Sequence, residues 1–117
     1  MTLHLQGHLV LIAEDQALIA LDIRDAVRNA GASALVAATL KDGLRFAEHP
    51  QLSAAVLDVA LGADDCSPLC ERLSERRIPF VISTGYSAIP ASCAEGVVIS
   101  KPALPSTLVA ALARMLR

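Results

Sequence analysis

The chain has 117 residues, with ten basic and twelve acidic side chains and a formal net charge of −2. This length suffices for one domain with its own apolar core, which needs neither a disulfide nor a metal for stability. The charge balance and an aromatic content of 3% disfavour nucleic acid as a partner, since such proteins carry clustered basic residues and stacking aromatics. No apolar run approaches the roughly 20 residues of a membrane span, and residues 1–7 lack a signal-peptide pattern, so we expect a cytoplasmic protein without a membrane partner.

Short apolar runs alternate with segments of helical periodicity, after residues 1–7, which we expect to form an N-terminal extension. In chain order the pattern predicts a strand at 8–13, a helix at 16–30 ended by Gly31, a strand at 34–38, a helix at 41–49 and a strand at 54–59. A helix capped by Asp64 or Asp65 and ending at Arg77 follows, then strands at 80–84 and 97–100 and a last helix capped by Ser106. We therefore expect one α/β domain over residues 1–117, a doubly wound parallel sheet with helices on both faces.

Polar residues stand at or just past the ends of four predicted strands: Glu14, Asp15, Asp58, Thr84 and Lys101. Ligands of open parallel sheets bind beyond the carboxyl ends of the strands, so these side chains are expected to converge there. Each residue alone has a simpler explanation, such as a helix cap for Glu14 and Asp15 or a turn for Asp58. The set in this order is more specific than any of its members.

The expected group suits phosphoryl transfer. Three carboxylates that lie together repel one another, and Mg²⁺ is a cation that prefers such oxygen ligands and bridges them to phosphate. Asp58, held between Mg²⁺ and the ammonium group of Lys101, is a candidate nucleophile that forms an acyl phosphate. The hydroxyl of Thr84 is placed to donate to the bound phosphoryl group.

The order of Glu14-Asp15, Asp58, Thr84 and Lys101-Pro102 resembles the CheY-like receiver domain of two-component response regulators, over essentially the whole chain. The resemblance implies a flavodoxin-like five-stranded sheet with strand order 2-1-3-4-5. It implies that Glu14 and Asp15 bind Mg²⁺ together with Asp58 and the backbone carbonyl of Ala60. It also implies that Asp58 is phosphorylated by a histidine kinase or a histidine phosphotransfer protein, with Lys101 on the phosphoryl group and Thr84 as the switching hydroxyl.

Two departures concern how the signal is read out. Receivers typically carry Tyr or Phe three residues before the lysine, where this chain has Val98. The region of the fourth helix, residues 86–95, contains Pro90 and little helical periodicity, so that helix is expected to be short or irregular. We therefore expect phosphorylation to shift or order the segment 85–96.

Residues 79–86 are similar to the Pro-Phe-x-Phe-Ala-Thr-Gly-Gly/Tyr-Tyr signature of α-proteobacterial single-domain receivers, which are associated with HWE-class histidine kinases. Ile82 and Ser83 replace the Phe and Ala of that signature, and Ser87 replaces its final Tyr. Neither the apolar side chain of Ala60 nor Tyr86 beside the site favours attack by water, so slow autodephosphorylation is expected.

Three functions remain open. The first is a stand-alone receiver, which we expect to lack an output domain because the chain ends at Arg117. Such a receiver alters contacts with a partner protein or removes phosphoryl groups from a kinase. It is not an enzyme beyond this self-catalysed chemistry. The second is a phosphorylation-independent adaptor, which the intact pocket disfavours. The third is a nucleotide-binding or hydrolytic site, which the lack of a glycine-rich loop after the first strand disfavours.

The chain has three cysteines, an odd number that does not suit a closed disulfide framework. Cys66 and Cys70 are four residues apart and would share one helical face. A metal or redox pair is left open, but we favour small apolar side chains that are buried or half-buried.

Overall fold

Five parallel strands form one sheet in the computed structural model, which describes residues 3–85 and 89–117. The strand order is β2-β1-β3-β6-β7, which is the predicted 2-1-3-4-5 topology once the two short strands β4 and β5 are set aside. The strands are β1 Leu9–Ala13, β2 Ser33–Ala37, β3 Ala54–Asp58, β6 Phe80–Thr84 and β7 Val97–Ser100. The two central strands β3 and β6 are buried along their whole length, as the apolar runs predict for a sheet covered on both faces.

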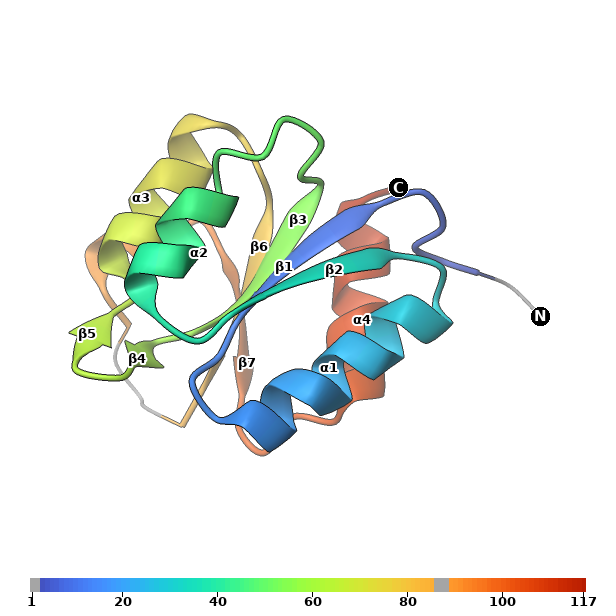
Figure 1. Ribbon diagram of the computed structural model, residues 1–117, viewed down its shortest axis with the longest axis horizontal. Coiled ribbons are helices and arrows are strands. Elements are labelled where there is room, and N and C mark those ends of the chain that lie inside the picture. Colours follow the sequence, from blue (N-terminus) through green and yellow to red (C-terminus); the bar gives the residue numbers. More distant parts are fainter. Residues whose placement is uncertain (1–2, 86–88) are drawn as a thin grey trace.

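Two helices cover each face of the sheet (Figure 1). Helices α1 (Ala17–Asn29) and α4 (Pro105–Met115) lie on one face, and α2 (Leu40–Phe46) and α3 (Ser67–Glu75) lie on the other. Each layer has its own apolar cluster, with Ile23, Val27 and Leu112 on the first face and Leu57, Leu69 and Leu73 on the second. The doubly wound fold is therefore confirmed.

The third helix begins later than predicted because a small hairpin precedes it. Strands β4 (Ala60–Leu61) and β5 (Asp64–Asp65) pair antiparallel directly after β3. Asp65 still serves the helix, because its carboxylate accepts a hydrogen bond of 2.9 Å from the N–H of Ser67. The cap predicted at Ser106 is wrong: α4 begins at Pro105, whose fixed φ suits a first helical position, and Ser106 lies inside the first turn.

The described residues ahead of β1 are anchored on the domain. Leu5 is fully buried in the cluster of α1 and α4, and its N–H donates to the carbonyl of Ala30 over 2.8 Å. Gly31 has a φ of +98°, and a Cβ there would lie 2.9 Å from the Cα of Gln6. The glycine predicted to end α1 thus also makes room for the N-terminal segment to cross behind it.

The predicted irregular fourth helix is confirmed: among the described residues between β6 and β7, the helical structure is one 3-10 turn, η1 (Ala91–Cys93). All three cysteines are buried, as expected, but two of them are more than apolar side chains: Cys70 and Cys93 form a disulfide. Cys93 approaches from η1, 23 residues away, and no local spacing in the sequence indicates that contact. Within the described ranges, the helices are too short or too polar to cross a membrane.

Candidate functional site

The strand ends converge as predicted. Glu14 follows β1 and Asp58 is the last residue of β3, so the parallel register of these two strands brings their carboxylates to one edge of the sheet. Oxygens of Glu14, Asp15 and Asp58 lie within 4.8 Å of one another. Glu14 and Asp58 are buried, with 4% and 7% of their surfaces exposed, whereas Asp15 is exposed. The site is therefore acidic, half-enclosed and open on the side of Asp15.

Lys101 provides the compensating charge. It follows β7 at the same edge, and its Nζ donates to Asp58 Oδ2 over 2.9 Å. The same ammonium lies 3.8 Å from Glu14 Oε2, so one cation serves two buried carboxylates. Two buried negative charges and one positive charge leave the pocket with an excess of negative charge, which favours a further cation.

The ionisation of the pocket reflects this excess. Burial raises the pKa of Glu14 to about 7, and the negative charge of Asp58 adds to the effect. The N–H of Gln16, which donates to Glu14 Oε1 over 3.0 Å, and the charge of Lys101 work against that rise. Burial lowers the pKa of Lys101, but its hydrogen bond to Asp58 and the nearby carboxylates outweigh this and raise it overall. Lys101 is thus a permanent cation, while Glu14 is costly to ionise without a counter-charge.

The hairpin after β3 completes the acidic side of the pocket. The N–H of Ala60 donates to Asp58 Oδ1 over 3.4 Å, and the N–H of Gly62 donates to Asp15 Oδ2 over 3.0 Å. Gly62 has a φ of +65°, which a glycine adopts at little cost in a tight turn. Its role in orienting Asp15 was not predicted, because only the folded hairpin brings residue 62 back to residue 15.

Thr84 ends β6 and is almost fully buried, with 1% of its surface exposed. Its carbonyl accepts a 2.8 Å hydrogen bond from the N–H of Lys101, which ties the end of β6 to the residue that bears the ammonium. Ser83, also buried, lies opposite Asp58 in the register of β3 and β6 and was not singled out from the sequence. The five predicted site residues therefore all lie at this edge. Tyr86, expected to limit water access, lies outside the described residues.

The residues present fit a hard divalent cation. Glu14, Asp15 and Asp58 offer carboxylate oxygens, the ligand type that Mg²⁺ prefers, and Asp15 leaves the site accessible to ion and water. Ala60 lies beside them, with its N–H directed at Asp58, and the role of its backbone carbonyl as a metal ligand stays a prediction.

Solved structures with the same fold are receiver domains. A CheY-like receiver domain protein from Methanospirillum hungatei JF-1 superposes with a TM-score of 0.83 at 23% identity, covering 93% of each chain. The receiver domain of a sensor histidine kinase from Pseudomonas aeruginosa PAO1, described with a magnesium ion coordinated in its active site cleft, gives a TM-score of 0.78 at 22% identity, covering 94% of this chain and 98% of that one. The chemotaxis response regulator CheY4 of Vibrio cholerae gives 0.77 at 22% identity, with coverage of 93% and 98%. No family model matches the sequence, and neither does any curated protein.

At these identities the likeness establishes the fold. The chain has the CheY-like flavodoxin fold, and its structural neighbours are response regulator receiver domains that match it over most of its length.

Proposed function

We propose that this chain is a two-component receiver that accepts a phosphoryl group on Asp58 in a Mg²⁺-dependent reaction. The observation that carries the proposal is the buried carboxylate of Asp58, which lies between a lysine ammonium 2.9 Å away and two further carboxylates. A buried carboxylate in such surroundings is costly unless charges on both sides compensate it.

In the proposed reaction, a carboxylate oxygen of Asp58 attacks phosphorus while the bond from phosphorus to the donor breaks. The electron pair leaves with the donor, as acetate from acetyl phosphate or as a neutral imidazole from phosphohistidine. Glu14, Asp15, Asp58 and the backbone carbonyl of Ala60 would hold Mg²⁺, which would supply positive charge to the oxygens of the transferring group. Lys101, released from Asp58 as that carboxylate becomes an acyl phosphate, contacts the phosphoryl oxygens instead.

The proposed donor is a histidine kinase or a histidine phosphotransfer protein in the cytoplasm. The likeness of residues 79–86 to the signature of α-proteobacterial single-domain receivers favours the HWE class of kinase. Transfer from an HWE kinase at least about tenfold faster than from a kinase of another class would support this choice, and equal rates would contradict it.

The proposed output is a change in the segment 85–96 that alters contacts with a partner protein. Alternatively, the domain takes phosphoryl groups from the kinase and acts as a phosphate sink. Val98, at the position where receivers typically carry an aromatic residue, is 46% exposed and has too small a side chain to act as an aromatic switch. The proposed chemistry is phosphotransfer to Asp58 followed by autodephosphorylation. The second step is slow because the apolar side chain of Ala60 cannot orient a water molecule. A phosphoryl half-life of seconds in purified protein with Mg²⁺ would contradict the slow step.

The decisive experiment is incubation with Mg²⁺ and acetyl phosphate, followed by mass spectrometry of the intact protein. We expect a gain of one phosphoryl group that is lost in Asp58→Asn and in the presence of a chelator. Asp64→Asn is the matched control, because Asp64 is an exposed aspartate in the adjacent hairpin and lies outside the carboxylate cluster. No gain with acetyl phosphate or with any kinase tested would favour the phosphorylation-independent adaptor.

A further inference from the structure

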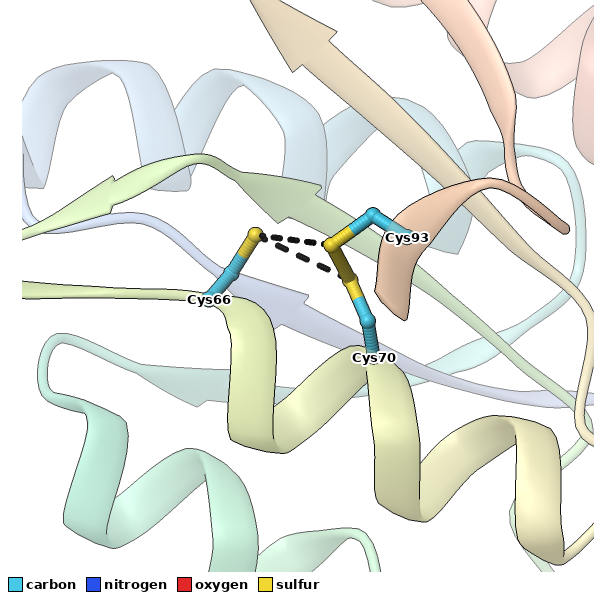
Figure 2. A group of neighbouring side chains, drawn as sticks. All are labelled: Cys66, Cys70 and Cys93. Carbon is cyan, nitrogen blue, oxygen red and sulfur yellow. Dashed lines mark hydrogen bonds between the residues drawn. A yellow bond between two sulfur atoms is a disulfide. The ribbon is translucent and has the colours of Figure 1, made fainter. Parts of the chain in front are cut away.

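A cluster of three cysteine side chains lies between α3 and η1 (Figure 2), and none of the three belongs to the group of carboxylates in the acidic pocket. Cys66 caps the start of α3, Cys70 lies one turn further along, and Cys93 ends η1. All three are fully buried. Cys70 and Cys93 form a disulfide, and the thiol sulfur of Cys66 lies 3.7 Å and 3.6 Å from theirs.

The segment around η1 depends on α3 for its position. A single 3-10 turn of three residues is not stable by itself. Its own backbone bonds among the described residues are three, from the N–H groups of Cys93, Ala94 and Gly96 to the carbonyls of Pro90, Ala91 and Cys93. Toward α3, the hydroxyl of Ser92 donates to the carbonyl of Ser67 over 3.2 Å. Beside these weak contacts, the disulfide is the covalent tie between η1 and α3.

The disulfide joins two connections that both leave the candidate site. Helix α3 follows β3, which ends at Asp58, by way of the short hairpin. Segment 89–96 lies between β6, which ends at Thr84, and β7, which precedes Lys101. The disulfide therefore links the connection that follows the Asp58 strand to the connection between the Thr84 and Lys101 strands.

We propose that Cys70 and Cys93 form a reversible redox clasp, which fixes segment 89–96 on α3 when oxidised and lets it move when reduced. The clasp rests on the proposed function for its purpose, since it would set how far the segment responds to phosphorylation of Asp58. In the oxidising direction the two thiols, which are fully buried and become accessible when η1 moves away from α3, react with a small-molecule disulfide such as glutathione disulfide, through a mixed disulfide. The small disulfide receives the two electrons and two protons and departs as two thiols; a dithiol reverses the reaction.

Cys66 is a bystander in this exchange. It lies almost equally far from both bonded sulfurs, so it faces the side of the disulfide, whereas thiol exchange requires attack along the axis of the bond. Burial also raises the pKa of the Cys66 thiol to about 11, and a protonated thiol is a poor nucleophile. A structural zinc site is a weaker explanation, because such sites have four ligands and this group in the described chain has three.

The first test counts thiols by alkylation in denaturant and mass spectrometry, after equilibration of the folded protein in glutathione buffers. We expect one alkylated cysteine in oxidising buffer and three in reducing buffer. Cys66→Ala is the matched control and should give none and two. Three thiols in the oxidising buffer would overturn the proposal, and so would stoichiometric zinc retained by the reduced protein, because a metal would hold η1 as firmly as the disulfide.

The second test measures amide hydrogen exchange of residues 89–96 in oxidised and reduced wild-type protein, which avoids any variant that fails to fold. We expect exchange at least about tenfold faster after reduction, with the central strand β3 unchanged. Equal rates in segment 89–96 would overturn the clasp.

Both tests are independent of Asp58, so a failure of phosphorylation leaves them intact. If Asp58 does accept phosphate, the phosphorylation-induced change in exchange over 89–96 should be larger in the reduced protein than in the oxidised protein. A change of the same size in both would overturn the clasp while leaving the proposed function standing.

Discussion

The acidic pocket and the cysteine cluster are both built where loops leave the sheet, but they use opposite physical means. In the pocket, charged groups are held by the ends of regular strands, and most of the backbone near them is paired in the sheet. In the cluster, apolar sulfur side chains hold an irregular turn that has little backbone pairing of its own.

This difference separates the chemistry from the response. Pre-organised strand ends keep Asp58 and Lys101 in a fixed geometry, which phosphoryl transfer requires. A loosely bonded segment beside them can change its position at low cost, which a switch requires. The cysteines determine how loose that segment is.

The largest expected effect comes from removing the positive side of the pocket. Lys101→Ala should lower the rate of phosphorylation by acetyl phosphate by about 10²- to 10³-fold, because the ammonium 2.9 Å from Asp58 is the nearest cation of the chain to the reacting oxygens. The rate is followed by intact mass over time. Lys41→Ala, at the chain's other lysine on the exposed face of α2, should leave the rate unchanged. A loss of less than threefold in Lys101→Ala would mean that the strand-end geometry does not govern the chemistry.

The second variant disturbs the turn and spares the pocket. In Gly96→Ala the new Cβ would lie 2.5 Å from Cε2 of Phe80, in a ring that is buried and cannot move aside freely. We expect a loss of about 3 kcal/mol in the free energy of unfolding by urea, typical of overpacking. Gly85→Ala is the control, because a Cβ there meets nothing within 4 Å. The folded Gly96→Ala protein should still be phosphorylated by acetyl phosphate. An unchanged free energy of unfolding would show that the turn is not packed against Phe80.

The same contrast explains what could be predicted from the sequence. The strands and the convergence of the five pocket residues were predictable, because apolar runs mark buried parallel strands and strand ends meet at one edge. The order of the strands was implied only by the resemblance to receiver domains. Each pocket residue, from Glu14 to Lys101, stands next to its own strand in the sequence. The positions of the pocket side chains then follow from the topology of the sheet.

The parts that were not predictable depend on contacts between distant, irregular segments. The hairpin after Asp58 has two-residue strands, too short for any periodicity, and it delayed the start of α3. Cys93 meets Cys70 only because η1 folds back on α3, a contact that no spacing along the chain indicates. The same holds for Gly62, which reaches Asp15 through the turn of the hairpin.

A third prediction concerns the pH dependence of the pocket without metal. The pKa of Glu14 is raised from 4.5 to about 7 in the folded protein, so the folded state binds a proton that the unfolded state has lost between these values. The contribution of Glu14 to the free energy of unfolding is therefore fully present below pH 4.5 and is lost as the pH rises through about 7.

Glu14→Gln keeps the acceptor for the Gln16 N–H and removes this titration. In chelator, the variant should gain on the order of 2 kcal/mol over wild type between pH 5 and pH 8, less than the full shift from 4.5 to about 7 implies because part of that change occurs below pH 5. Urea unfolding at each pH measures the difference, in which the titrating groups outside the pocket cancel. Parallel stability curves for the two proteins would contradict a buried, proton-binding Glu14.

The smallest expected effect comes from replacing Cys66, which separates its role from that of the Cys70–Cys93 disulfide. Cys66→Ala removes one buried sulfur from a fully packed site, so we expect a loss of about 1 kcal/mol in the free energy of unfolding, similar to removal of a buried methyl group. Phosphate uptake and the formation of the Cys70–Cys93 disulfide should be unchanged, since Cys66 belongs to neither reaction. If Cys66→Ala abolished the disulfide, the three cysteines would act as one exchanging unit, and the cluster would resemble the pocket in needing every member.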